Sequence, residues 1–393
     1  MNDPFRIWDI AVIGAGVVGL SCAFQLARDG FTVAVVESER PGSGASSVAA
    51  GVLSARPEPD PTLEPLVALQ LDSLKRYPQF IADVEAASGM TVGYRTEGSI
   101  WIALDESDQP EWERLLQLNR ARKLPVERLD ADQVRALEPC LSEPYIGGLH
   151  LTGEAQVDPR RLLPALERAV GSLGVSIITG WSALHAVRDI SSRPRIVRIR
   201  IIDGYDRSSV QARRMIITAG HKHDELLNFA TEPSTSLVPI GTRGVKGQIL
   251  SFQGPRILNH VIKTRDVLMV PRDTGELIVG ATIEEGTSDP TPDPHAAADL
   301  LRATRRVMPR IDDFELGEHR VGFRPAVQDN LPAIGRKHRD SVWVANGHYR
   351  NGIQLAPATA YWLARAIRSG RPSKLIKPFA LDRLTPASEE DRR

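Results

Sequence analysis

The sequence is poor in cysteine and balanced in charge. Its 393 residues include only two cysteines, Cys22 and Cys140, which match neither a disulfide framework nor a CxxC metal site, so we expect no bound metal. Lys and Arg total 49, as do Asp and Glu, which argues against binding to nucleic acid or anionic membranes. The chain has no run of about 18 apolar residues and no recognisable signal peptide. We therefore expect a cytoplasmic protein without a membrane span.

The N-terminal residues have the pattern of a dinucleotide-binding unit. The apolar run Asp9–Ile13 is typical of a buried parallel strand, and the helical spacing of Leu20–Arg28 predicts a helix. Between them lies the GxGxxG segment Gly14–Gly19. Phe31–Val36 predicts a second strand that ends at Glu37. This order of elements favours a Rossmann-like α/β fold.

Each part of this motif has a physical task. Gly14 permits the tight turn, Gly16 lets the backbone approach a pyrophosphate, and Gly19 lets helix and strand pack closely. The start of the helix offers free N–H groups to the phosphates. Glu37 is placed to accept hydrogen bonds from ribose hydroxyls, and its charge disfavours NADP. The predicted contacts are made by Gly14, Ala15, Gly16, Val17, Val18, Gly19 and Glu37.

The segment after Glu37 is rich in small residues and hydroxyls. Such a loop lets the backbone approach a long, extended cofactor, which favours FAD over NAD. The hydroxyls of Ser46 and Ser47 are placed to bond phosphate oxygens. A flexible surface loop that binds nothing is the alternative interpretation. The contacts predicted here are made by Ser38, Ser46, Ser47, Ala49, Ala50, Gly51 and Val52.

Periodicity predicts the elements in the rest of the chain. One helix should begin at Asp158, where an N-cap residue precedes Pro159. A hairpin should join Val267–Val270 to Leu277–Ala281 through the turn Asp273–Gly275. The other predicted helices are 63–88, 109–123, 131–137, 293–307 and 356–369. The other predicted strands are 99–103, 175–178, 195–202, 214–218 and 341–345.

Further motifs carry a family resemblance. Among them are Gln156–Arg161, Val245–Gln248 and Gly322–Pro325, and the most specific are Gly347–Gly352 and Leu355–Thr359. With the N-terminal unit, they make the chain resemble the glycine oxidase branch of the D-amino acid oxidase superfamily. The resemblance extends over nearly the whole length.

The resemblance implies two interleaved domains. An FAD domain would comprise residues 1–85, 150–232 and 323–393, and a substrate domain with an antiparallel sheet would comprise residues 86–149 and 233–322. The fold class would be α/β with an α+β second domain. FAD would be bound without a covalent link, since neither cysteine suits one. Relatives of this kind imply a homo-oligomer, with a tetramer as one form.

The resemblance also implies a substrate site over the flavin. Arg324 matches the arginine that binds the substrate carboxylate, and a guanidinium fork suits that group. Arg350 would bridge cofactor and substrate, and His348 would either tune the flavin or make a structural hydrogen bond. The backbone N–H groups of Asn351, Gly352 and Ile353 would stabilise negative charge on the flavin. Cofactor contacts are completed by Ala183, Ala219, Gly220, Arg324, His348 and Arg350.

One position departs from the family pattern. Glycine oxidases of this type carry a tyrosine where this chain has Leu268, with Tyr349 as a possible replacement for its hydroxyl. Loss of a donor to a charged group costs about 1.5–3 kcal/mol of binding unless another group replaces it. The change leaves room for a bulkier or N-substituted substrate. Ile283 matches an apolar pocket position of the relatives.

Three functions follow from the resemblance. The first is an oxidase that converts glycine, sarcosine or a small D-amino acid to a 2-oxo acid and reduces O2 to H2O2, with a role in thiamine thiazole synthesis. The second is a D-amino acid or N-methyl amino acid dehydrogenase that uses a quinone or another acceptor. The third is a flavoprotein of RNA modification or assembly, against which the neutral charge counts.

Overall fold

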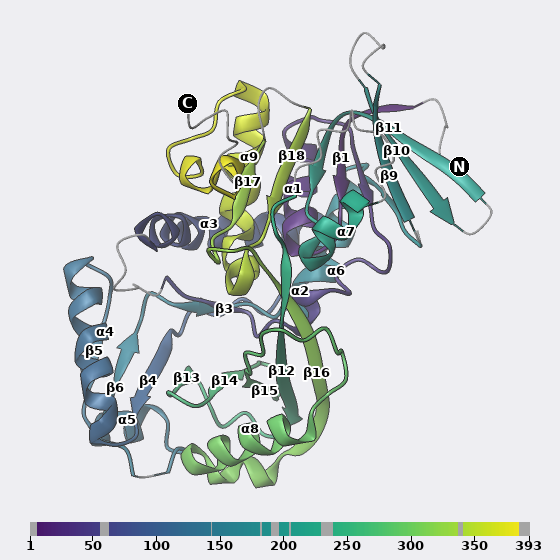
Figure 1. Cartoon of the computed structure of the whole chain (residues 1–393). Coiled ribbons are helices and arrows are strands. Elements are labelled where there is room, and N and C mark those ends of the chain that lie inside the picture. Colours follow the sequence, from purple (N-terminus) through teal and green to yellow (C-terminus); the bar gives the residue numbers. More distant parts are fainter. Residues whose placement is uncertain are drawn as a thin grey trace.

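Two large sheets, each of eight strands, form the framework of the described chain (Figure 1). The computed structural model describes residues 6–55, 63–142, 144–180, 183–189, 196–203, 206–228, 239–336 and 341–384. The first sheet and its helices occupy the upper half of Figure 1, and the second sheet occupies the lower half. A small sheet of β3 (Val52–Leu53) and β7 (Ala155–Gln156) lies near their junction. This architecture confirms the predicted α/β fold class. The second sheet, predicted to be antiparallel, is mixed, because residues 261–263 pair in parallel with residues 99–101.

The first sheet is parallel at its centre. β1 (Ile7–Ile13) pairs in parallel with β2 (Val33–Val36) on one side and with β11 (Asp206–Ile217) on the other. All four residues of β2 are buried, as expected for a strand covered on both faces. The sheet is completed by β8 (Ser176–Ile178), β9 (Ala183–Asp189), β10 (Ile196–Asp203), β17 (Ala333–Gly335) and β18 (Val342–Asn346).

The second sheet carries the predicted hairpin. β14 (Leu268–Pro271) and β15 (Glu276–Gly280) pair antiparallel, and Gly275 in their turn has a φ of 83°, which favours glycine. The hairpin lies beside a pair of long strands that were not predicted as strands, β12 (Arg243–Gln253) and β16 (Glu315–Ala326). The other strands are β4 (Ser99–Ala103), β5 (Glu127–Leu129), β6 (Gly147–Leu151) and β13 (Val261–Lys263).

Helices cover both sheets and follow the predicted pattern closely. The Asp158 carboxylate accepts the N–H of Arg160 at 2.9 Å and Pro159 is the first helical residue, which confirms the predicted helix start. No helix in the described ranges is long and apolar enough to cross a membrane. The helices are α1 (Val17–Arg28), α2 (Ala45–Val48), α3 (Glu64–Ser88), α4 (Gln109–Ala121), α5 (Ala131–Leu137), α6 (Pro159–Ser172), α7 (His223–Asn228), α8 (Pro294–Val307) and α9 (Gly352–Ser369).

The division into two interleaved domains stays a prediction. The main hydrophobic core joins α1, α3, α6 and α9 to the first sheet, and a second core lies between the second sheet and α5 and α8. Two of the predicted domain borders, at 149/150 and 322/323, fall inside β6 and β16. Long strands therefore run from one half of the molecule into the other.

The helix α9 begins four residues earlier than predicted. Pro357 lies inside it, although the helix was predicted to run from about Ala356. Proline has no N–H to bond the carbonyl of Ile353, four residues back. The hydroxyl of Tyr77, on α3, donates to that carbonyl at 2.5 Å instead. A side chain distant in sequence thus keeps the helix intact through its first turns, and local pattern could not reveal this.

We expect Tyr77→Phe to lower the free energy of unfolding by about 1–3 kcal/mol, because the buried Ile353 carbonyl loses its donor. Chemical denaturation measures this change. Tyr361→Phe, on α9 itself, is the matched control, since its hydroxyl meets only the exposed Arg365 and should cost less than about 0.5 kcal/mol. Equal losses in the two variants would contradict the proposed role of Tyr77.

Candidate active site

A cavity of about 1320 Å³ lies between the two sheets. It is larger than the range of about 300–1,000 Å³ usual for a single small ligand, so it has room for a dinucleotide and a second molecule. Its walls come from the glycine turn after β1, the loop around α2, the second sheet and the start of α9. Elements distant in sequence thus meet around one space.

The glycine turn is packed where glycine is required and open where a ligand would lie. Gly14 has a φ of 102°, and a Cβ there would lie 2.6 Å from the carbonyl oxygen of Thr218. A Cβ on Gly19 would overlap the carbonyl of Gly14. Gly16 instead lines the cavity, with only the Ser46 hydroxyl near its missing Cβ. The turn therefore presents bare backbone to the cavity, as a pyrophosphate requires.

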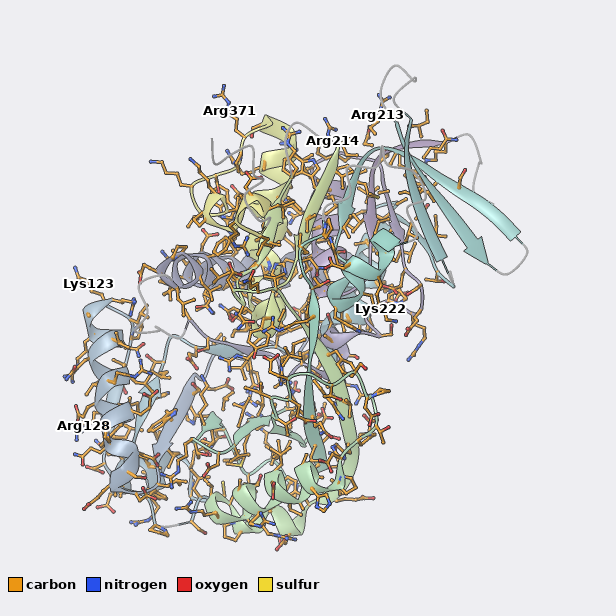
Figure 2. The ribbon with its side chains drawn as sticks, viewed as in Figure 1. Lys123, Arg128, Arg213, Arg214, Lys222 and Arg371 are labelled. Atoms are coloured by element: carbon orange, nitrogen blue, oxygen red, sulfur yellow. The ribbon has the colours of Figure 1, made fainter. Side chains whose placement is uncertain are left out.

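Glu37 anchors this turn as well as facing the cavity. One of its carboxylate oxygens accepts the N–H of Ala15 at 2.7 Å, and the other accepts the N–H of Glu39 at 3.1 Å. The oxygen that accepts from Glu39 also accepts the Ser38 hydroxyl at 3.2 Å, and the oxygen that accepts from Ala15 has a further lone pair for a ligand hydroxyl. Beyond it, Lys222 lies directly before α7 (Figure 2), lines the same end of the cavity and pairs with Glu39 at 3.4 Å. The ribose contact of Glu37 stays a prediction.

The two predicted serines differ in position. Ser46 lines the cavity, and its hydroxyl oxygen accepts the N–H of Val17 at 3.1 Å, so its proton remains free for a phosphate oxygen. The hydroxyl of Ser47 donates to the carbonyl of Gly44 at 3.0 Å and does not line the cavity. The phosphate contact of Ser47 stays a prediction, with its donor used within the turn in this structure.

Most other predicted residues do line the cavity, with three exceptions. Ala15 and Gly19 support the turn from behind, and Ala183 begins β9, where the placement of its side chain is not described. The predicted residues that line the cavity are Gly14, Gly16, Val17, Val18, Glu37, Ser38, Ser46, Ala49, Ala50, Gly51, Val52, Ala219, Gly220, Leu268, Arg324, His348, Tyr349, Arg350, Asn351, Gly352 and Ile353.

The turn before α9 forms the positive end of the site. The N–H of Asn351 donates to the carbonyl of His348 at 2.8 Å, and its stabilisation of flavin charge stays a prediction. Gly352 and Ile353 are the first two residues of α9, and their N–H groups have no partner within the helix. These two groups, with the positive end of the helix dipole, favour an anion at the cavity wall.

His348 is a neutral member of this wall. It is 2 % exposed, and its Nε2 lies 3.0 Å from the hydroxyl of Thr359. Burial lowers the pKa of His348 to about 4. The imidazole is therefore uncharged near neutral pH and contributes hydrogen bonds rather than a positive charge.

The guanidinium of Arg324 lies flat against the backbone of β12. A Cβ on Gly247 would overlap it, so only glycine leaves it this place. It donates to the carbonyl of Thr282 at 3.0 Å and to that of Lys246 at 3.3 Å. Gly247 belongs to a motif that carried the resemblance, but its task as a seat for Arg324 was not predicted.

No acid neutralises the two arginines of the site. Among the described residues, no carboxylate lies within 4.0 Å of the guanidinium of Arg324 or Arg350. Burial, followed by the positive charge of Arg350, lowers the pKa of Arg324, and the charges of Tyr349 and Glu284 act in the opposite direction. Two cations that line one cavity without an ion-pair partner favour a bound anion, and a carboxylate matches the fork of a guanidinium.

The part of the second sheet beside the seat of Arg324 is apolar. Leu268 lines the cavity at the start of β14, opposite Gly280, and packs with Ala281 against the cluster of Ile249 and Val270. Ile283, also in the wall, is 52 % exposed. Neither Cys22 nor Cys140 lines the cavity, and both are buried. The residues present therefore fit a dinucleotide that is not attached through cysteine.

Comparison with known proteins agrees with this geometry. Residues 9–366 match the model of a family described as FAD dependent oxidoreductase. The chain is 30% identical over 380 residues to a glycine oxidase of Geobacillus kaustophilus, with 96% of this chain and 97% of the relative covered. It is 31% identical over 390 residues to a bifunctional protein ThiO/ThiG of Synechocystis, of which it spans 54%. The crystal structure of the Geobacillus kaustophilus glycine oxidase superposes with a TM-score of 0.86 at 28% identity and covers 97% of this chain and all of that one.

The lowered pKa of His348 predicts a loss of stability in acid. The unfolded chain has the ordinary histidine pKa of about 6.5 and binds this proton more readily than the folded chain, so stability is full above about pH 6.5 and falls toward pH 4. We expect the buried imidazole to account for about 2 kcal/mol of the loss between pH 7 and pH 5. Denaturation at both pH values should show a smaller loss in His348→Gln than in the wild type. The control is His295→Gln at an exposed position, which should lose as much stability between pH 7 and pH 5 as the wild type. If His348→Gln also loses as much as the wild type, His348 does not cause the acid sensitivity.

Proposed function

The chain belongs to the family of FAD-dependent oxidoreductases, and from this premise we propose that it oxidises a small amino acid held by its carboxylate at Arg324 and Arg350. The proposed products are the 2-oxo acid, ammonia or an amine, and H2O2 formed from O2. Relatives that carry the names glycine oxidase and ThiO/ThiG support this reaction type. A place in thiazole formation for thiamine stays a prediction from the resemblance.

One observation carries the proposal. Arg324 is largely buried, lines the cavity, and has only backbone carbonyls as its bonding partners among the described residues. A buried cation without a counter-ion is costly unless a ligand supplies the negative charge. The carboxylate of an amino acid would do so with two parallel hydrogen bonds.

FAD would be held by the glycine turn, Glu37, Ser46 and the start of α9, and when bound it supplies the acceptor for the hydride of the substrate. The protein fixes the orientation of the substrate. With its carboxylate on Arg324, the rest of the molecule would lie over Gly247, Ile249 and Gly280. These residues offer no charge to the amine.

An apolar surface next to the amine favours its neutral form. Desolvation disfavours an ammonium group, so the amine would release its proton to water as the substrate enters. Burial lowers the pKa of His348 to about 4 and its Nε2 is bonded to Thr359, so it is a poor proton acceptor and the proposal does not use it as a base. The lone pair of a neutral amine then assists loss of hydride from the adjacent carbon. The chain thus acts by binding, orienting and desolvating the substrate.

We expect Arg324→Ala to raise the KM for the substrate by roughly 10- to 150-fold, because a hydrogen-bonded charge partner worth about 1.5–3 kcal/mol is lost. Flavin content should not change. Peroxide release, measured with glycine, sarcosine and D-alanine, gives the KM.

Arg320→Ala is the matched control on the same strand. Its guanidinium is already paired with Glu276 and Glu318 and does not line the cavity, so KM should remain as in the wild type. An unchanged KM in Arg324→Ala would remove this arginine from the substrate site. Flavin reduction by amino acids without peroxide, but with turnover on an artificial acceptor, would select a dehydrogenase instead.

Leu268→Tyr should restore the donor that the resemblance leads us to expect in glycine oxidases. We expect the KM for glycine to fall by about tenfold, because the new hydroxyl reaches the substrate carboxylate. The KM for N-ethylglycine should rise, since the ring occupies its space. Leu268→Phe adds the ring without the hydroxyl, so it should lower neither the KM for glycine nor the KM for N-ethylglycine. If the tyrosine and phenylalanine variants behave alike, the hydroxyl has no part in binding.

A further inference from the structure

A row of five residues crosses the second sheet beneath the cavity. In register, Trp101 is opposite Lys263, Lys263 is opposite Leu268, Leu268 is opposite Gly280, and Gly280 is opposite Ile249. All five line the cavity. Directly opposite residues lie on the same face of a sheet. The cavity floor therefore runs from Ile249 on β12, two residues from the seat of Arg324 at Gly247, across β15 and β14 to Lys263 on β13.

Lys263 belongs to a compact polar cluster at the far end of this row. Its ammonium pairs with the carboxylate of Glu154, which also accepts the hydroxyls of Ser54 and Ser99. Lys263 has a second contact with the Ser54 hydroxyl at 3.5 Å. Side chains of Lys263 and Glu154 are 18% and 10% exposed. The family reaction proposed above makes no use of this cluster.

The cluster offers a donor without a net charge. An ammonium has three N–H bonds, and the described residues supply two acceptors to Lys263. One N–H therefore remains for a molecule in the cavity. Because Glu154 balances the lysine charge and would repel a second carboxylate, the cluster suits an uncharged acceptor such as an ether, hydroxyl or amide oxygen.

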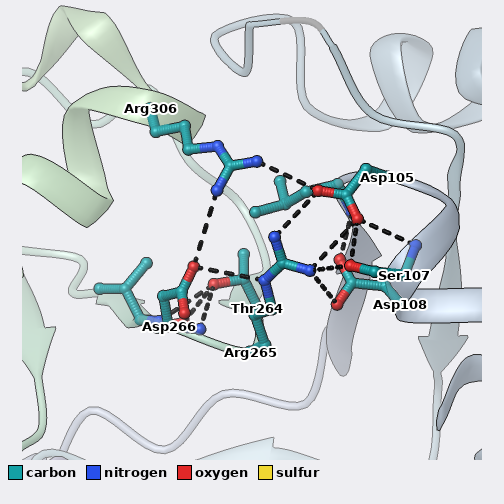
Figure 3. A network of polar contacts seen from close by, with 9 residues as sticks. Asp105, Ser107, Asp108, Thr264, Arg265, Asp266 and Arg306 are labelled. Carbon is teal, nitrogen blue, oxygen red and sulfur yellow. Dashed lines mark hydrogen bonds and ion pairs between the residues drawn. The ribbon is translucent and has the colours of Figure 1, made fainter.

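The turn between Lys263 and Leu268 is fixed from outside. Figure 3 shows Arg265 bonded to Asp105 at 2.9 Å and to Asp108 at 3.2 Å, with Arg306 joining Asp105 at 3.2 Å. Asp266 in the same turn pairs with Arg265 at 3.6 Å. Contacts from the segment that follows β4 and from α8 thus hold the turn. A fixed turn preorganises the two residues it joins, since their spacing does not have to be set on binding.

We propose that Lys263, held by Glu154, is a second anchor of the substrate site and binds an uncharged oxygen at the end of a substituent on the amino acid. The preferred substrates would then be amino acids extended on nitrogen or on the α-carbon, rather than glycine. This inference rests on the proposed function, because Arg324 must hold the carboxylate.

The spacing sets the length of the substituent. Three strand separations of about 4.8 Å put β13 about 14 Å from β12, and Gly247 lies two residues, or about 7 Å, along β12 from Ile249 in the row. About 16 Å therefore separates Gly247 from Lys263 across the sheet. Hydrogen-bonded contacts of about 3 Å at each end leave about 10 Å, which the lysine side chain and the ligand share. A chain of about six bonds from carboxylate to distal oxygen fits the ligand's part of this length.

Two acids that cannot be oxidised as amino acids test the anchor directly. (2-Methoxyethoxy)acetate carries an ether oxygen where butoxyacetate, which has the same length, carries a methylene group. Titration of each into the FAD-loaded protein, followed by the change in flavin absorbance, gives two dissociation constants. We expect the ether to bind at least about tenfold more tightly in the wild type. In Lys263→Met/Glu154→Gln the ratio should fall to about one.

The controls separate the possible failures. Lys123→Met, at an exposed position outside the cavity, should keep the wild-type ratio. If the double variant loses flavin, Lys263→Met alone replaces it with the same expectation. A wild-type ratio near one, or a high ratio that survives loss of Lys263, would overturn the anchor. A third outcome is that the wild type binds the ether acid tightly and selectively, but no extended amino acid reduces the flavin. This outcome would reject the proposed function. The selectivity of Lys263 for an ether oxygen would still stand as a ligand-binding property.

Discussion

The site depends on a buried guanidinium that has no acid as partner among the residues that the structure describes. Arg324 lies on β16, and its guanidinium packs over Gly247 of the paired strand β12, where a side chain would overlap it. Two backbone carbonyls, of Lys246 and Thr282, accept its N–H groups. Carbonyls satisfy its hydrogen bonds without neutralising its charge. The protein thus keeps the cation in place and leaves the negative charge to be supplied by a ligand. The orientation of that ligand, and hence the atom presented for oxidation, follows from this arrangement.

The two sheets are coupled where the cofactor loop meets the substrate wall. Val48, Ala50 and Val52 pack against a cluster that contains Ile249 and Val270 of the second sheet. In addition, the buried Arg272 donates to the carbonyl of Ala50 at 2.5 Å. A shift of the loop would therefore displace the part of the second sheet beside the seat of Arg324. Cofactor binding and substrate placement are linked through direct packing rather than through a distant relay.

Local patterns predicted the parts of the fold that local interactions determine. The glycine turn, the cap at Asp158 and the hairpin around Gly275 each depend on neighbouring residues, and the structure confirms them. The start of α9 was misplaced because Tyr77, far away in the sequence, replaces the hydrogen bond that Pro357 cannot make. The row itself was not predicted, because its ends depend on pairings between residues far apart in sequence, Gly280 with Ile249 and Lys263 with Trp101. The resemblance supplied Arg324, but only the structure shows its lack of a counter-ion.

A crystal structure of the FAD-loaded protein with glycolate, which has a carboxylate but no amine, tests the central claim most directly. The account predicts that the glycolate carboxylate makes two hydrogen bonds to the guanidinium of Arg324 while that guanidinium remains over Gly247. Glycolate bound elsewhere in the cavity, or Arg324 turned away to pair with a carboxylate of the protein, would contradict it.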